Sequence, residues 1–284
     1  MNNWIADGIL RTVGRLNGVR PYDWLDRLEV MQWWDADRMK AWQEAELVGI
    51  VTHAASNVPL YRETLPSDAL MQIGSDSRSF SDFPILTKDM VRAGFDALQA
   101  ENRGSSSRAQ IISTSGSTGK PMRTRVDNPA FGRYFAAKLR ALRWYGVDFA
   151  DRQLRVWGLM MAGHKRVYWK VRDLLQNRLR LVSYDLSDER LERFWPELEQ
   201  FRPAYVNGYT SAVQRLADFI EKTGKDGRSL GVKVVVPTAE MLYDWQREQM
   251  SRVFGCPVMN EYGGAEVQAI AYQCSVGTLH PTHE

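Results

Sequence analysis

The sequence lacks the features that commit a chain to an oxidising compartment, a membrane or a polyanionic partner. Its 284 residues include only two cysteines, Cys256 and Cys274, too few for a disulfide framework and not spaced as a Cys-x-x-Cys pair. No apolar stretch is long and uninterrupted enough for a signal peptide or a membrane span. The 37 basic and 34 acidic side chains give a formal charge of +3, too balanced to indicate nucleic acid as a partner. These absences predict a reduced, cytoplasmic protein.

The first hundred residues have the pattern of helices. The composition is that of a globular protein, with 44% hydrophobic and 25% charged residues. Tryptophans and aliphatic residues recur here at three- and four-residue spacing, which predicts a core-facing aromatic stripe that includes Trp24, Trp33, Trp34 and Trp42. A membrane-surface helix is the alternative, disfavoured because acidic residues match the basic ones. We expect a mainly helical region over residues 1–104, with breaks at residues 57–59 and 83–84.

From about residue 110 onward, short apolar runs alternate with helical patterns. The runs at residues 154–159, 179–184, 204–206 and 232–236 predict buried strands, and Ile111-Ile112 predicts the end of a short one. Helices are predicted from Asn128-Pro129 onward and over residues 188–201, 211–222 and 242–254. This alternation indicates an α/β domain over residues 105–284 with a mostly parallel sheet, whose ligands bind beyond the carboxyl ends of the strands.

A Ser/Thr/Gly-rich segment over residues 113–121, Ser-Thr-Ser-Gly-Ser-Thr-Gly-Lys-Pro, has the chemistry of a phosphate loop. Its two glycines let backbone amides approach an anion, and its hydroxyls and lysine add donors and positive charge. It is not a Walker A loop, which requires glycine in place of Thr114 and Ser or Thr in place of Pro121. Composition alone would also allow a flexible linker.

Two downstream segments have side chains suited to a nucleotide. Residues 260–266, Asn-Glu-Tyr-Gly-Gly-Ala-Glu, offer an aromatic face that can stack on a base and a carboxylate suited to Mg²⁺, although such a segment alone is also typical of a loop leading into a helix. Residues 237–240, Pro-Thr-Ala-Glu, directly follow a predicted strand. The alternative for that segment is a helix start, with Thr238 as the cap and Glu240 in the first turn.

In order and spacing, these segments resemble the motifs of adenylate-forming enzymes, the superfamily of acyl-CoA synthetases and nonribosomal adenylation domains. The segments at residues 57–62, 83–88, 208–211 and 271–280 resemble the phenylacetate–CoA ligase and CapK-like group within it. The resemblance covers nearly the whole chain from about Asn57. It implies the fold of the large N-terminal domain of such an enzyme, without the small C-terminal domain.

The resemblance also implies roles for individual residues. Lys120 and Glu266 would be catalytic, with Glu266 binding Mg²⁺ and Tyr262 packing on the adenine. The ATP contacts would come from Thr114, Ser115, Gly116, Ser117, Thr118, Gly119, Lys120, Ala239, Glu240, Glu261, Tyr262 and Gly263. One departure is Ala265, where the group usually has Thr or Ser, so a hydroxyl near the α-phosphate is missing.

The implied activity is ATP-dependent conversion of a carboxylic acid to an acyl adenylate, with CoA or another acceptor taking the acyl group; aryl acids are the best-known substrates of the group. The acid is expected near residues 156–164 and 207–210. Family members continue past this point with a ribose-binding aspartate, a hinge and a C-terminal domain, so a missing domain or partner chain is expected. The alternative is a truncated or degenerate, non-catalytic nucleotide-binding or assembly protein in polysaccharide or secondary-metabolite biosynthesis. Cys274 and His280 alone do not make a zinc site.

Overall fold

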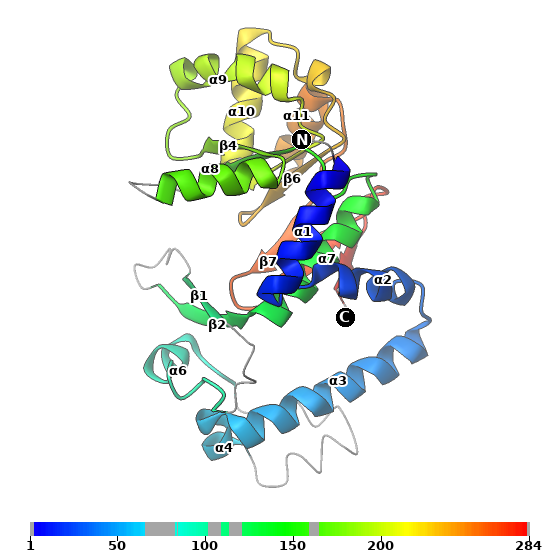
Figure 1. The fold of residues 1–284 in the computed structure, drawn as a ribbon, viewed down its shortest axis with the longest axis vertical. Coiled ribbons are helices and arrows are strands. Elements are labelled where there is room, and N and C mark those ends of the chain that lie inside the picture. The colour runs from blue at the N-terminus through cyan, green and yellow to red at the C-terminus, as the bar shows by residue number, and fades with distance from the viewer. Residues whose placement is uncertain are drawn as a thin grey trace. The chain divides into compact units, whose positions relative to one another are not determined.

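The computed structural model describes residues 3–65, 83, 85–101, 109–113, 121–158 and 165–282 (Figure 1). The chain divides into two compact units, Met1–Leu16 with Tyr134–Thr282, and Asn17–Arg133. Across the described ranges, no helix combines the length and apolarity that crossing a bilayer requires. The boundary expected at residues 104 and 105 lies outside the described residues and stays a prediction.

The described part of the unit of residues 17–133 is mainly helical. It contains α2 (Pro21–Met31), α3 (Ala36–Asn57), α4 (Pro59–Thr64), α6 (Lys88–Ala93) and the antiparallel strands β1 (Ala109–Ser113) and β2 (Arg123–Asp127). Asp35 caps α3 by accepting a hydrogen bond from the Arg38 amide at 2.8 Å, and α3 ends just before Pro59. The expected core-facing stripe is wrong for Trp33, which is 82% exposed because it follows the end of α2.

The other unit is built on a seven-stranded sheet in the order β4-β3-β5-β6-β7-β8-β9. Its strands are β3 (Gln153–Trp157), β4 (Arg178–Val182), β5 (Tyr205–Tyr209), β6 (Val234–Thr238), β7 (Glu261–Gly264), β8 (Gln268–Gln273) and β9 (Leu279–Pro281). The first five strands of that order are parallel, and β7, β8 and β9 pair antiparallel. The prediction of an α/β fold is confirmed, and the antiparallel end makes the sheet mixed.

Helices lie on both sides of these strands. They are α1 (Asn3–Asn17), α7 (Asn128–Arg143), which begins in the other unit, α8 (Lys165–Leu175), α9 (Asp188–Phe201), α10 (Thr210–Thr223), the short 3-10 helix η2 (Gly227–Leu230) and α11 (Asp244–Phe254). Figure 1 shows α9, α10 and α11 on one side of the sheet and α8 on the other. The three helices predicted after residue 187 are confirmed with ends within two residues.

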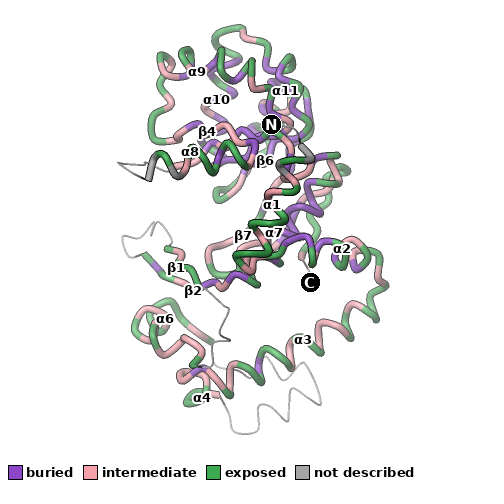
Figure 2. Tube along the Cα trace, in the orientation of Figure 1, coloured by how far each residue is buried: buried purple, intermediate pink, exposed green. Residues whose placement is uncertain are grey.

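The two faces of the sheet differ in chemistry. Leu154, Val156 and Val206 point to the side of α9–α11 and belong to one large aliphatic cluster. Because side chains alternate along a strand, Arg155 and Asn207 point to the opposite side, where they are neighbours in register. Figure 2 shows buried residues concentrated in these strands and in α10, whereas Val51 is the buried residue of α3. We call the two sides the aliphatic face and the polar face.

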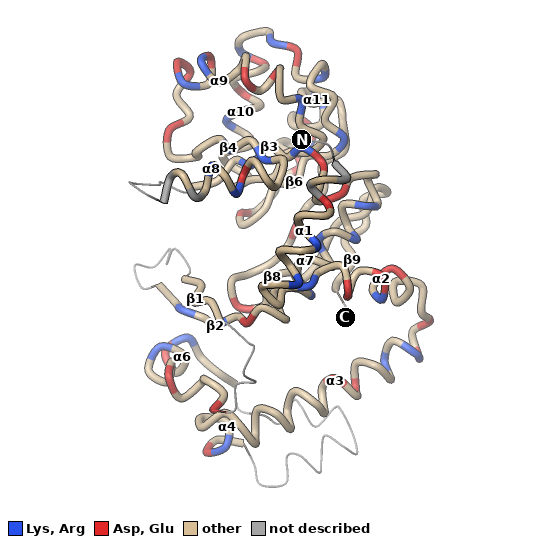
Figure 3. Tube along the Cα trace, viewed as in Figure 1, with Lys and Arg blue, Asp and Glu red and all other residues tan. Residues whose placement is uncertain are grey.

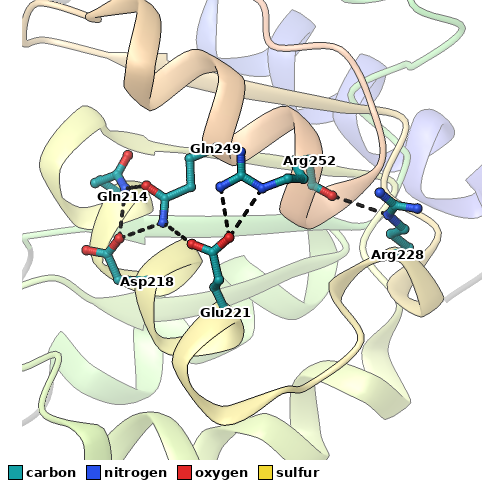
Figure 4. A network of polar contacts seen from close by, with 6 residues as sticks. All are labelled: Gln214, Asp218, Glu221, Arg228, Gln249 and Arg252. Carbon is teal, nitrogen blue, oxygen red and sulfur yellow. Dashed lines mark hydrogen bonds and ion pairs between the residues drawn. The ribbon is translucent and has the colours of Figure 1, made fainter.

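A surface network joins α10, α11 and η2 on the outside of the aliphatic layer (Figure 4). Glu221 accepts hydrogen bonds from Arg252 at 2.8 Å and from Gln249 at 2.8 Å. Gln249 also donates to Asp218 at 2.9 Å, and Arg228 donates to the Arg252 carbonyl at 3.2 Å. Charges of both signs are spread over these helices, in keeping with the balanced composition (Figure 3).

Candidate functional site

The loop after β6 is held in an unusual conformation. Thr238 is the last residue of β6, and Ala239 follows with a φ of 67°, a left-handed conformation that a non-glycine residue adopts only at a cost of about 1–2 kcal/mol. The Glu240 carboxylate stabilises it by accepting hydrogen bonds from the Ser211 amide at 2.6 Å and the Ser211 hydroxyl at 3.0 Å. The Glu240 carboxylate thereby binds the amino end of α10, which directly follows β5, and links it to the loop after β6.

The alternative in which Thr238 caps a helix is wrong. Thr238 pairs in the sheet opposite Glu261, and α11 begins later, at Asp244. The strand extends through Thr238 because β5 also reaches that level, where Tyr209 is its partner.

The β7–β8 hairpin contains most of the segment at residues 260–266, in which an aromatic ring and a carboxylate suited to a nucleotide are predicted. Gly263 lies at an irregularity in the strand pairing, where a Cβ atom would come within 2.0 Å of the Gln268 carbonyl oxygen, so no larger residue fits without a backbone shift. Tyr262 is 55% exposed. Glu266 is exposed on the turn between the strands, and its carboxylate has no hydrogen bond or ion pair with the residues that the structure describes. The hairpin thus presents an aromatic ring and a carboxylate that is not engaged by this part of the protein.

Glu261, one residue before Tyr262, points into the protein. Its carboxylate forms a buried ion pair with Lys138 at 2.7 Å and accepts a hydrogen bond from Tyr134 at 3.1 Å. Lys138 also donates to Asn207 at 3.4 Å, and the Asn207 amide donates to the Val236 carbonyl at 2.9 Å. Because neighbouring residues of a strand point to opposite sides, this anchor leaves Tyr262 facing outward.

Electrostatics in this cluster follow from its burial. Burial lowers the pKa of Lys138, and Glu261 acts in the opposite direction by favouring the ammonium form. Burial together with the Glu261 charge raises the pKa of Tyr134 well above its usual value, so the phenol remains a hydrogen-bond donor. The contact between Lys138 and Glu261 links α7 to β7 inside the protein.

Sequence reasoning did not find Tyr134, Lys138 or Asn207 as partners of Glu261. The available signal was a lysine within the apolar run Phe-Ala-Ala-Lys-Leu of α7, one helical turn after Tyr134. A buried lysine requires a partner. That partner lies 123 positions away, and no local pattern identifies it.

The predicted phosphate-loop residues, Thr114 through Lys120, lie outside the described residues. The strands on either side of them, β1 and β2, pair antiparallel with Ser113 opposite Arg123. Among the other predicted residues, Ala239, Glu240, Glu261, Tyr262, Gly263 and Glu266 all belong to the unit that contains the sheet.

Comparison with known proteins gives a consistent picture. No family model matches the chain. Protein CapK of Staphylococcus aureus is 26% identical over 213 residues, which cover 74% of this chain and 46% of CapK. The phenylacetate-coenzyme A ligase of Escherichia coli (strain K12) is 26% identical over 267 residues, covering 90% of this chain and 58% of the ligase. The chain thus spans about half the length of the curated relatives that it matches.

The chain is related to the phenylacetate–CoA ligase and CapK-like group of adenylate-forming enzymes. A structure of 2-hydroxyisobutyryl-CoA ligase in complex with 2-HIB-AMP and CoA shares the fold, with a TM-score of 0.67 and 17% identity, covering 87% of this chain and 54% of that one. The adenylate-forming fold expected from the sequence is confirmed.

Among the described residues, no three His, Cys, Asp or Glu side chains cluster as a metal cage. The free Glu266 carboxylate fits a different mode, because Mg²⁺ commonly takes one or two carboxylates together with phosphate oxygens and water. Cys256 and Cys274 are free thiols, and the His280 ring lies edge-on to Trp144 with a centroid separation of 5.7 Å.

Proposed function

We propose that this chain carries the part of an acid–thiol ligase that binds ATP and a carboxylic acid and converts them to an acyl adenylate. The observation that supports this most is the β7–β8 hairpin, in which buried Glu261 anchors a strand that presents Tyr262 and leaves Glu266 unengaged by the described residues. This hairpin lies in a chain that matches a phenylacetate-coenzyme A ligase over 90% of its length. The acyl group then passes to CoA, and the protein works in the cytoplasm.

In the proposed reaction, a carboxylate oxygen of the acid attacks the α-phosphorus of ATP. The bond from that phosphorus to the bridging oxygen breaks, and pyrophosphate leaves with the bonding electrons. In the second step, the CoA thiolate attacks the acyl carbonyl and AMP leaves. Both steps depend mainly on positioning and on neutralising phosphate charge.

Residues of this chain would share that work. Residues 114–120 would hold the β- and γ-phosphates through backbone amides, hydroxyls and Lys120. Tyr262 would stack on the adenine, beside the loop that Ala239 and Glu240 form. Glu266 would hold Mg²⁺, which when bound neutralises phosphate charge. The Lys138–Glu261 pair would keep β7 in register, so that the exposed ring and the free carboxylate are held in place before ATP arrives.

The direct test is calorimetric titration of the full chain with ATP and Mg²⁺. The unmodified chain is compared with the Lys120→Ala, Glu266→Ala double variant and with Glu248→Ala, which removes an exposed carboxylate of α11 as a matched control. We expect binding by the unmodified chain and the control, and its loss in the double variant. Equal binding by all three proteins would rule out the proposed site. Pyrophosphate release with a panel of carboxylic acids, with hydroxylamine to trap acyl adenylate, then tests the chemistry.

A second candidate is a non-catalytic nucleotide-binding or assembly protein. Ala265 favours it, because a hydroxyl that could bind the α-phosphate is missing and its loss weakens a charged contact by about 1.5–3 kcal/mol. Similarity to CapK is compatible with it. Binding of ATP without pyrophosphate release, in both the unmodified chain and an Ala265→Thr variant, would favour this candidate. Appearance of release in Ala265→Thr would show that one hydroxyl separates the two functions.

A further inference from the structure

Among the described residues, the polar face of the sheet carries more cationic side chains than carboxylates. Lys138 is paired with Glu261, and both Arg178 and Arg180 lie near Asp173, at 3.6 Å and 2.7 Å. Arg155, between them on β3, has neither an ion pair nor a hydrogen bond from its guanidinium to any residue in the described ranges. Its position is fixed by register, opposite Arg180 on one side and Asn207 on the other.

This arrangement is costly for an arginine. Burial lowers the pKa of the Arg155 guanidinium, and the neighbouring Arg180 lowers it further, against the favourable charge of Glu261. The side chain is nonetheless partly exposed, so it is not sealed from solvent or from a ligand. Five donors with no acceptor among the described residues form a site that an anionic oxygen pair would complete.

Aromatic rings extend this site toward the carboxyl ends of the strands. The Arg155 guanidinium carbon lies 4.6 Å from the centroid of the Trp157 ring, and that ring stacks on Tyr209 with centroids 4.2 Å apart and planes 18° apart. Strands rise about 3.3 Å per residue, so the Arg155 Cα lies roughly 7 Å before the Trp157 Cα along β3, and the Arg155 side chain extends toward the Trp157 ring. Trp157 and Tyr209 end these two strands and lie within residues 156–164 and 207–210, near which the acid is expected.

We propose that Arg155 selects acids that carry a second anionic group, with the stacked Trp157 and Tyr209 rings lining one side of the spacer between the two groups. This rests on the proposed function, since the reacting carboxylate must lie near the α-phosphate at the strand ends. The second carboxylate then reaches down to Arg155 and supplies the negative charge that the polar face lacks. The proposed contacts to adenine and Mg²⁺ follow β6 and lie on β7 and its turn, whereas Arg155 is on β3 with β5 in between.

The test compares two probes that differ only in the second charge, 4-carboxyphenylacetate and 4-methylphenylacetate. Their binding to the full chain is measured by calorimetry without ATP, so the result does not depend on catalysis. The variants are Arg155→Gln, Arg155→Lys, and Arg190→Gln as a control that removes a surface guanidinium from α9. Since Arg155 has no carboxylate partner to leave unpaired, Arg155→Gln should fold, and urea unfolding checks this.

We expect the unmodified chain and Arg190→Gln to prefer the diacid at least tenfold. Arg155→Gln should lose that preference, and Arg155→Lys, which keeps the charge, should retain much of it. The proposal is overturned if the unmodified chain binds neither probe or binds both equally, or if Arg155→Gln keeps the preference. An Arg155-dependent preference in a chain that releases no pyrophosphate would support this inference while rejecting the proposed ligase activity.

Discussion

On one face of the seven-stranded sheet, Leu154 and Val156 pack among aliphatic side chains of α9, α10 and α11. On the other face, the alternating residue Arg155 lies in a row with Arg180 and Asn207, close to the Lys138–Glu261 pair. The same strands therefore carry two environments only one residue apart in sequence. Dispersion and apolar burial stabilise the first environment. The second contains buried charges, whose desolvation cost offsets the stability that they add.

The contrast separates stability from function. Replacing a buried ion pair with apolar residues of similar size is often neutral or stabilising, so the polar face is not needed to hold the sheet together. The aliphatic face already supplies a continuous core on one side. We infer that the polar face is retained for what it positions, namely the outward side of β7 and the guanidinium of Arg155.

The largest effect is expected from breaking the ion pair on one side only. Lys138→Met leaves the Glu261 carboxylate buried without its cation and should lower the free energy of unfolding by about 3–5 kcal/mol. Urea denaturation measures this loss. The double variant Lys138→Met, Glu261→Gln removes both charges and keeps an acceptor for Tyr134, so it should recover most of the stability.

The double variant also sharpens the comparison. If it regains stability but binds ATP more weakly than the unmodified chain, the polar face acts in positioning. If the single and double variants are equally unstable, the Lys138–Glu261 pair is needed for stability, as the aliphatic face is. The two faces would then not differ in what they contribute.

On the aliphatic face, Leu154→Ala should cost about 2–5 kcal/mol, because the side chain is fully buried in the centre of the cluster. Thermal or urea unfolding checks this value. Val276→Ala, which shortens a side chain that is 86% exposed, is the control and should stay within about 0.5 kcal/mol of the unmodified chain. Unlike Lys138→Met, Leu154→Ala should leave the ATP affinity of the folded molecules unchanged.

The sequence predicts much of the aliphatic face and little of the polar one. Periodicity locates β3 to β6 and α9 to α11 to within three residues, because apolar runs that face a core are visible locally. It misses β7, β8 and β9: β7 (Glu-Tyr-Gly-Gly) and β9 (Leu-His-Pro) are short and lack such runs, and the apolar stretch of β8 is only four residues long. It identifies Glu261 only through its motif neighbours, since a lysine 123 positions away decides where that carboxylate points.

Cys256 provides a pH test of the aliphatic face. Burial in the cluster raises the pKa of this thiol from 9.0 to about 12, so the folded state holds the proton more tightly than the unfolded state does. The resulting stabilisation is complete below pH 9 and is lost as the pH rises toward 12, by about 1.4 kcal/mol per pH unit at most. Between pH 9 and 10, the unmodified chain should lose about 1 kcal/mol more than Cys256→Ala does.

Cys274→Ala is the matched control, because Cys274 is only partly buried. It should follow the unmodified chain over the same pH range. Iodoacetamide at pH 8 should label Cys274 well before Cys256 in the folded protein. Rapid labelling of Cys256 would contradict the closed aliphatic cluster.

The smallest effect is expected outside both faces, in the network of Figure 4. Glu221→Gln removes the ion pair between Glu221 and Arg252. Both side chains are about half exposed, so water and salt ions already compete for each partner. Hydrogen bonds from Arg252 lower the pKa of Glu221, so its contribution is present near neutral pH and is lost as the pH falls. Urea midpoints at low and high salt measure the effect, with Glu248→Gln on α11, the helix that carries Arg252, as the control. A shift that rivals that of Leu154→Ala, or that does not shrink with salt, would mean that this network supports the fold as strongly as the aliphatic face beneath it.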